Sequence, residues 1–413
     1  MSDPALLEDD YDPFEAFDRA QGAGVVRTPY PLFAELRRAG AVQQVDLAQV
    51  MGLGDGIDLG ELQSFSAMTY DAVTQVLRDG ETFSSSGYAA SMGMVMGHTI
   101  LEMDEPEHHR YRALIQQAFT RKAMERWEAD LVRPIVDRYI DAFADRGSAD
   151  LVRELCFPFP VHVIAGMLGL PAEDLPQFHR WAVELISVGV DWERGLAASQ
   201  KLREYFAGIL QQRRSAPSND VISVLAGAEL DGHTLTDEEI FAFLRLLLPA
   251  GAETTYRSSS NLFFGLLSDP DQLAALRDDR SLLPQAIEEG LRWEPPLTGI
   301  ARLSMRETVV GGVTVPAGAV MHVNIGAANH DETRWDDPER FDIFREQKPH
   351  HAFAFGPHMC LGLHLARMET TVVVNAVLDR LPNVRLDATA DDVHITGAVF
   401  RAPRALPVVF DVT

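Results

Sequence analysis

The chain has 413 residues, 46% of them hydrophobic, and a formal net charge of −25. This length suffices for a large core, and the apolar fraction is that of a globular protein. Two cysteines exclude a disulfide framework and fit a reducing cytosol, and the excess of 61 acidic over 36 basic residues argues against a nucleic-acid partner.

The first part of the chain, residues 1–24, is acidic and weakly patterned, and we expect it to be an extended lead-in to one domain over residues 25–413. It lacks the charged-then-apolar pattern of a signal peptide, and no stretch reaches the roughly eighteen apolar residues that a membrane span needs. We therefore expect a cytoplasmic protein that has no membrane partner and is a monomer.

Hydrophobic periodicity predicts a fold made mostly of helices. A short helix over residues 30–38 precedes strand-like runs at 42–47 and 64–69. Further helices are predicted at about 70–79, 107–119, 121–146, 150–168, 172–188, 194–214, 237–267, 270–278, 282–293 and 361–381. Residues 309–323 have the pattern of a hairpin with Gly311 and Gly312 at its turn. Long helices with a minority of strand indicate a mainly α (α-rich α+β) fold with a small β-sheet region.

The helix predicted after Pro106 carries His108 and Arg112, four residues apart on one face. Two basic side chains that point the same way can hold an acidic group. The same spacing is also found on an ordinary polar helix face, and the residues alone leave both interpretations open.

The helix predicted over residues 237–267 starts at a capping box formed by Thr236 and Glu239. Pro249 in its middle has no N–H to donate and leaves a carbonyl without its helical donor. Thr254 can donate its hydroxyl to the carbonyl of Ala250 and bend the helix further. The small residues 250–252 then leave a groove for a flat ligand, although a kink used only for packing has the same sequence.

Glu289 and Arg292, three residues apart, share a helix face and can pair. Taken alone, such a pair is typical of a solvated surface and contributes well under about 1 kcal/mol. The paired histidines His350 and His351 have no third ligand at a zinc-like spacing, and we interpret them as surface residues.

The segment from Phe353 to Gly362, F-A-F-G-P-H-M-C-L-G, places Cys360 directly before a predicted helix. Unpaired N–H groups at a helix N-terminus favour the thiolate of such a cysteine. Gly356 and Gly362 let the backbone approach a flat, bulky group, so the segment predicts a thiolate that ligates a metal. The alternative is a buried, inert cysteine, which is our interpretation of Cys156.

The segment fits the pattern F-x-x-G-x-H-x-C-x-G, and in it the chain resembles the cytochrome P-450 family, whose members hold haem iron by a cysteine thiolate. The resemblance implies a cytochrome P-450-like fold, with haem b between the long central helix and the cysteine-loop helix. It makes Cys360 the axial iron ligand and Phe353, Gly356 and Gly362 cofactor-binding residues.

The long helix also resembles this family, in the oxygen-binding pattern A-G-x-[DE]-T. By this resemblance Ala250 and Gly251 lie at the cofactor, Glu253 relays protons, and Thr254 is the alcohol that assists oxygen activation. Two departures are that Glu replaces the commoner Asp and that Pro249 directly precedes the pattern.

The resemblance assigns roles to two more groups of residues. The donors to the haem propionates would be His108, Arg112, Arg302 and His358. A buried structural network that holds the haem-binding core would consist of Glu289, Arg292 and Arg340.

The function implied is that of a haem-thiolate monooxygenase, which inserts one oxygen atom of O2 into a small, apolar organic substrate. No flavin or iron–sulfur motif is present, so we expect electrons from a separate ferredoxin and its reductase. An acidic partner could dock at Arg110, Arg121, Lys122 and Lys348, unless these are scattered solvated charges. The alternatives are a peroxide-driven haem-thiolate peroxygenase and a non-enzymatic haem sensor. The pair of Glu253 and Thr254 favours oxygen activation.

The family places its substrate contacts in four regions, which here carry few charges. The substrate residues implied are Met92, Met94, Met96, Leu247, Leu297, Val399 and Phe400. The three methionines predict an adaptable apolar wall, although methionines that pack a core explain the same residues.

Overall fold

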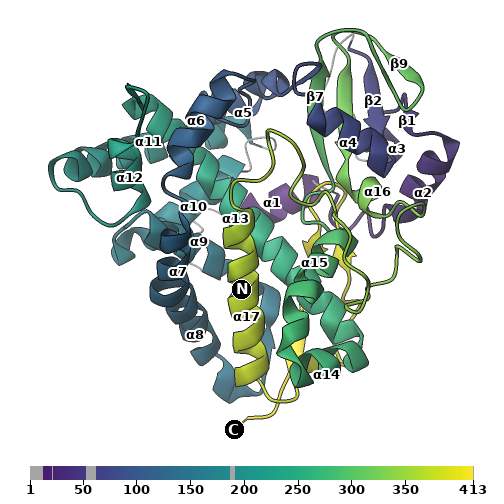
Figure 1. Cartoon of the computed structure of the whole chain (residues 1–413). Helices are drawn as coiled ribbons and strands as arrows, with labels where there is room; N and C mark the ends of the chain where they lie inside the picture. The colour runs from purple at the N-terminus through teal and green to yellow at the C-terminus, as the bar shows by residue number, and fades with distance from the viewer. Residues whose placement is uncertain (1–12, 21, 53–61, 187–190, 413) are drawn as a thin grey trace.

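The computed structural model describes residues 13–20, 22–52, 62–186 and 191–412. A long helix, α13 (Asp237–Ser268), contacts α9 (Pro158–Met167), α15 (Leu283–Trp293) and α17 (Leu363–Arg380), which surround it in Figure 1. Thr236 and Glu239 form the predicted capping box at its start. The apolar side chains of these four helices belong to one continuous core.

The remaining helices pack around these four or against the sheets (Figure 1). They are α1 (Pro13–Ala20), α2 (Tyr30–Ala39), α3 (Leu47–Val50), α4 (Tyr70–Arg78), α5 (Met92–Met96), α6 (Glu107–Gln116), α7 (Arg121–Trp127), α8 (Arg133–Asp141), α10 (Leu175–Ile186), α11 (Trp192–Ser215), α12 (Val221–Gly227), α14 (Pro270–Asp278) and α16 (Ile325–Asn329).

A five-stranded sheet with the order β1-β2-β10-β7-β3 lies to one side of the helices (Figure 1). Its strands are β1 (Val42–Gln43), β2 (Ser64–Ala67), β3 (Phe83–Ser84), β7 (Gly299–Ser304) and β10 (Val320–Asn324). Strand β10 is parallel to β2 and antiparallel to β7, with Met321 opposite Arg302. The smaller sheets are formed by β4 (Ser148–Asp150), β11 (Arg385–Leu386) and β14 (Pro407–Val409), by β5 (Glu229–Leu230) and β6 (His233–Thr234), by β8 (Thr308–Val310) and β9 (Val313–Val315), and by β12 (Ile395–Thr396) and β13 (Ala402–Pro403).

Several expectations about local structure are wrong. The predicted helix over 150–168, for example, begins with the end of β4 and a π-helical turn before α9. The hairpin is shorter than predicted and consists of β8 and β9, because the fully buried Met321 and Val323 draw the following residues into the large sheet as β10. The predicted helix over 121–146 is interrupted by a π-helical turn between α7 and α8. The lead-in was expected to be extended, but its residues 13–20 form α1.

Helix α1 is held to the rest of the protein by ion pairs. Asp18 pairs with Arg257 of α13, and Glu15 pairs with Arg404 near the C-terminus. Among the described residues, no helix is long and apolar enough to cross a membrane.

Candidate active site

The cysteine loop is a tight turn immediately before α17. The backbone N–H of Cys360 donates to the carbonyl of Phe353 at 2.9 Å, and that of Met359 donates to the carbonyl of Gly356 at 3.1 Å. Gly356 has φ +75°, and a Cβ there would collide with the carbonyl oxygen of Leu77 in α4, so only glycine fits. Gly362 is different, since a Cβ there would meet nothing within 4 Å. The protein's own packing does not require this glycine, and the space beside it fits a flat group.

The Cys360 thiol lies in a largely buried environment, which raises its pKa. The backbone N–H of Gly362 and the guanidinium groups of Arg112 and Arg367 act in the opposite direction but do not outweigh burial. The N–H group at the helix start thus favours the thiolate as expected, but its effect is smaller than that of burial. A bound metal ion would supply the missing charge, because a coordinating thiol is deprotonated outright.

Four side chains from three separate segments converge on the cysteine loop. The rings of His108 and His358 stack with their centroids 4.0 Å apart, and Arg112 donates to the carbonyl of Met359 at 2.6 Å. Arg302 on β7 also acts on His358. Burial is the main cause that lowers the pKa of His358 to about 3, and His108, Arg302 and Arg112 lower it further. Burial also lowers the pKa of His108, so both imidazoles are neutral.

Glu105 lies 3.2 Å from Nδ1 of His108, but the two arginines of this cluster lack such a partner. In the described part of the chain, neither Arg112 nor Arg302 forms an ion pair with a carboxylate, and burial lowers the pKa of both. The Nε2 atom of His108 is buried and finds no partner among the described residues. Buried cations and donors without counter-charges are unfavourable. A flat ligand that brings its own carboxylates, as haem does, fits these residues.

Two polar residues of this cluster were missed by the sequence-based interpretation. Ser85 Oγ lies 3.2 Å from Nε2 of His358, and the hydroxyl of Tyr88 accepts the backbone N–H of Ala301 at 3.0 Å. Both precede the recognisable motifs, and nothing in the spacing of residues 84–90 distinguishes them from an ordinary loop.

In α13, the residues after Pro249 make the predicted side-chain hydrogen bond. Thr254 donates its hydroxyl to the carbonyl of Ala250 at 2.8 Å, which confirms the expected side-chain bond. Gly251 faces α9, because a Cβ there would lie 2.8 Å from Cδ1 of Ile164. The structure thus gives Gly251 a role in helix packing, and its contact with a cofactor remains a prediction.

Glu253 is buried and held by an arginine one turn further along α13. Nε of Arg257 donates to Oε1 of Glu253 at 2.8 Å, and Nη2 donates to the same oxygen. Burial nevertheless raises the pKa of Glu253, against the lowering effect of Arg257. Thr254 and Glu253 therefore make separate hydrogen bonds, one to the helix backbone and one to Arg257.

The predicted structural network is present, with one wrong member. Arg292 donates to both carboxylate oxygens of Glu289, at 2.7 and 2.8 Å, and both side chains are buried. Arg340 was expected to be the third side chain, but it is exposed and contributes only its backbone carbonyl, at 3.3 Å from Arg292. Arg345 takes its place, with Nε 3.2 Å from Glu289, because the chain turns after Arg340 and returns five residues later.

The two adjacent histidines of residues 350 and 351 were expected at the surface and are instead buried. Nε2 of His350 lies 3.3 Å from Glu288, and Nε2 of His351 lies 2.9 Å from the hydroxyl of Thr74 in α4. The His351 ring also stacks on that of Tyr70. Their amphipathic rings close the gap between α4, α15 and the cysteine loop.

The predicted substrate residues are brought together in part. Leu297 and Phe400 form a β-bridge, and the N–H of Thr298 donates to Val399 at 2.8 Å, so two segments a hundred residues apart are neighbours. Leu247 is buried on α13.

The three methionines do not form one wall. Met94 is 59% exposed, whereas Met96 is buried and Met92 packs against the main core. Residues two apart on a helix point to opposite sides, which explains the separation of Met94 from the other two.

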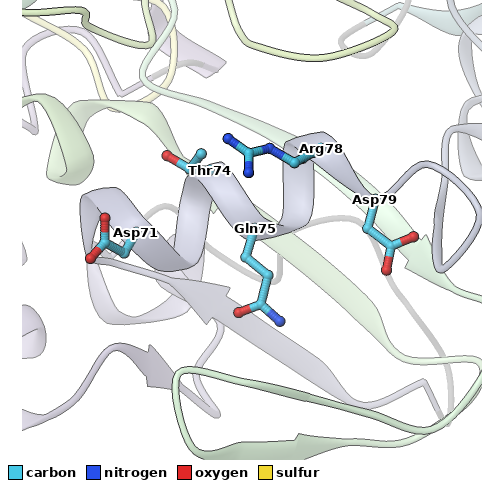
Figure 2. Close-up of a pocket in the computed structure, with 5 residues that line it drawn as sticks. All are labelled: Asp71, Thr74, Gln75, Arg78 and Asp79. Atoms are coloured by element: carbon cyan, nitrogen blue, oxygen red, sulfur yellow. The ribbon is translucent and has the colours of Figure 1, made fainter.

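A surface depression of about 570 Å³ lies along α4. Figure 2 shows its lining on one helix and the residue after it: Asp71, Thr74, Gln75, Arg78 and Asp79. It lies outside the cluster described above but beside the cysteine loop, since the guanidinium of Arg78 lies 5.4 Å from the ring centroid of Phe355.

Comparison with known proteins agrees with this arrangement. A family model described as Cytochrome P450 matches residues 180–384. Cytochrome P450 107B1 of Saccharopolyspora erythraea is 39% identical over 315 residues, which cover 76% of this chain and 77% of that protein. The Steroid C26-monooxygenase of Mycobacterium tuberculosis is 36% identical over 84% of this chain and 94% of its own length.

Solved structures give the same result. The crystal structure of CYP109E1 from Bacillus megaterium in complex with testosterone superimposes with a TM-score of 0.83 at 32% identity, covering 93% of this chain and all of the other. The chain belongs to the cytochrome P450 family. It is a monooxygenase with the mainly α fold of that family, and membership implies a haem cofactor.

Proposed function

We propose that this protein is a haem-thiolate monooxygenase in which Cys360 ligates the iron of haem b. The observation that carries the proposal is the cluster beside the Cys360 loop, in which no described residue pairs a carboxylate with Arg112 or Arg302 or bonds the buried Nε2 of His108. The haem, when bound, supplies the activation of dioxygen and the transfer of one oxygen atom.

The protein's own residues have three tasks in this proposal. His108, Arg112, Arg302 and His358 bind and orient the haem carboxylates through charge-assisted hydrogen bonds. Ala250 and Gly251 leave room on the α13 side, where Thr254 holds its hydroxyl near the helix backbone. Glu253 is buried and directly precedes Thr254 in the sequence. It takes up and releases protons on the α13 side of the haem.

For the substrate we propose a small apolar molecule, with a steroid-sized polycycle as the first class to test. Leu247, Leu297, Val399 and Phe400 are apolar, and three of them belong to the paired segments that the β-bridge joins. One relative is named Steroid C26-monooxygenase, and one structural neighbour is a complex with testosterone, which supports this choice.

We further propose a separate ferredoxin and reductase as electron donors. Beside the cysteine loop, Phe355 is 37% and Met359 is 42% exposed, and Arg78 extends over the Phe355 ring. Apolar side chains next to a cation suit an acidic partner that docks close to Cys360. Arg121 is already paired with Glu125 and Lys348 donates to the carbonyl of Arg334, so Arg78 is the better first candidate for mutation.

The test is visible absorption of the purified, haem-supplemented protein and of its Cys360→His variant. The reduced carbon monoxide complex of the wild type should give the band of thiolate-ligated haem, and the variant should bind haem and give a band of histidine-ligated type. A wild-type protein that is folded but binds no haem, or that gives the same band as the variant, would contradict the proposal. Titration with steroids should then shift the Soret band as a ligand displaces water from the iron.

A further inference from the structure

Arg257 divides one guanidinium group between two acids from distant parts of the chain. Its Nη2 atom donates both to Glu253 on the same helix and to Oδ1 of Asp18 on α1, the latter at 2.7 Å. Glu253 and Arg257 are 4% and 3% exposed, whereas the Asp18 side chain is 25% exposed. Arg257 therefore connects the buried Glu253 of α13 with Asp18 of α1, which is partly exposed to solvent.

Two aromatic rings lie against the guanidinium group of this triad. The guanidinium carbon of Arg257 lies 4.8 Å from the ring centroid of Tyr256 and 5.6 Å from that of Phe400. The Tyr256 ring packs edge-on against Phe157, which precedes α9. The charged and titratable groups that act on Glu253 are thus Arg257 and Tyr256 from α13 and Asp18 from α1. Low polarity around them strengthens every charge interaction within the triad.

Because Arg257 is shared, Asp18 influences the protonation of Glu253. Arg257 stabilises the carboxylate form of Glu253, and Asp18 opposes this, both by its own negative charge and by taking part of the same nitrogen's hydrogen bonding. Without Asp18, Glu253 would lose both this opposing charge and a competitor for Nη2 of Arg257. Without Arg257, Glu253 would be a buried acid beside a second acid and would favour its neutral form.

We propose that Asp18 and Arg257 are positioning residues that set the protonation and orientation of Glu253, so that α1 is part of the proton-delivery apparatus. The inference rests on the proposed function, in which Glu253 supplies protons on the Thr254 side. Arg257 holds the carboxyl group away from Thr254 until a proton arrives, and a protonated Glu253 is released because its bond to Arg257 then lacks the ionic component.

The first test is the titration of Glu253 itself, by infrared difference spectroscopy of the ferric, haem-loaded protein in the absence of substrate and reductant. The carboxylic-acid band that disappears in Glu253→Gln belongs to this residue. Its midpoint should move to lower pH in Asp18→Asn and to higher pH in Arg257→Gln. Arg257→Lys, which keeps the charge, should return the midpoint toward the wild-type value.

The second test is the pH profile of substrate oxidation. If neutral Glu253 donates the proton, kcat falls at high pH as this group ionises. This falling limb should move to lower pH in Asp18→Asn, with KM unchanged, and the fraction of electrons lost to peroxide should rise. Glu15→Gln is the matched control, because Glu15 lies on the same helix and pairs with Arg19 and Arg404 at the surface. Glu15→Gln should change neither the infrared titration of Glu253 nor the pH profile of substrate oxidation.

The outcomes separate this inference from the proposed function. Opposite shifts in the two variants, with Glu15→Gln unchanged, support it. Midpoints that stay fixed or move in the same direction overturn it, and Asp18→Asn alone decides if Arg257→Gln does not fold. A protein that binds no haem would refute the proposed function, while the Glu253 band could still be titrated in the haem-free protein.

Discussion

Arg292 donates two hydrogen bonds to the buried carboxylate of Glu289, at 2.7 and 2.8 Å. The same guanidinium group donates to the carbonyls of Asn329 and Pro338. One helix thereby fixes the path of the chain that leads to the cysteine loop. The arrangement satisfies a buried charge pair by geometry that few other residue types can reproduce.

Removing one member of this pair should therefore be severe. We expect Arg292→Met to lower the free energy of unfolding by about 3–5 kcal/mol, because it removes the two-pronged partner of a buried carboxylate and leaves Glu289 with a weaker ion pair to Arg345 and the backbone N–H of Asp342. Denaturant unfolding of the haem-free protein measures this. Arg340→Ala is the control and should change stability by less than about 0.5 kcal/mol, since its side chain is exposed. Equal effects of the two substitutions would show that the assignment of the network is wrong.

Two glycines of the cysteine loop should respond differently to alanine. Gly356→Ala should destabilise the protein by at least about 1–3 kcal/mol even without haem, because of its positive φ and the carbonyl of Leu77. Gly362→Ala should leave the haem-free protein stable, because its Cβ meets no protein atom, and should weaken haem binding. Thermal unfolding and haem content distinguish the two. If the Gly362→Ala variant binds haem as the wild type does, the space beside Gly362 is not needed for the cofactor.

The buried Glu369 on α17 should make stability depend on pH. Burial raises its pKa to about 8, opposed by a hydrogen bond with Thr255, whereas an unfolded carboxyl titrates near 4.5. Because the folded pKa is the higher one, the unfolded state releases its proton first, and stability falls as the pH rises from about 4.5 to 8.

The substitution Glu369→Gln should abolish this fall, so the variant should gain up to a few kcal/mol over the wild type at pH 8 and little at pH 5. Urea unfolding at both pH values measures the difference. Asp379→Asn, on the same helix with a 65% exposed side chain, should keep the wild-type dependence. Parallel curves for wild type and Glu369→Gln would contradict the expectation.

Loss of one proposed carboxylate partner should show in the rate of haem release. We expect Arg302→Gln to release haem at least about tenfold faster, since a charge-assisted hydrogen bond contributes roughly 1.5–3 kcal/mol. Transfer to a haem-scavenging protein provides the rate. Arg306→Gln, on the loop after the same strand and bonded to Thr82, is the control. If both variants release haem at the wild-type rate, Arg302 does not bind the cofactor.

Much of the helical framework could be predicted from sequence, because the helices carry strong periodicity and capping signals. Helix α14 has the predicted bounds, and α13 differs by one residue. Short elements could not be predicted: β10 depends on long-range pairing with β2 and β7, and the five residues of α16 carry no period of their own.

In the candidate site, too, residues of local sequence motifs could be predicted and residues that meet only through the fold could not. The members of local motifs, such as Cys360 and His358, could be proposed from the resemblance of those motifs to the family, and the pair of Glu289 and Arg292 proposed in the same way is present and buried. Arg345 and Asp18 could not, because their roles depend on where the chain returns in space. The methionines of α5 were misjudged because composition was considered without helical direction.

The contact between α4 and the cysteine loop is made by backbone atoms: the carbonyl of Leu77 fills the space that a side chain at Gly356 would need. Of the side chains that line the depression in Figure 2, Arg78 adds to this contact, because its guanidinium lies over the Phe355 ring. A change at Arg78 would therefore alter both the outer surface and a side-chain contact of the loop, whereas the backbone spacing between Leu77 and Gly356 does not depend on it.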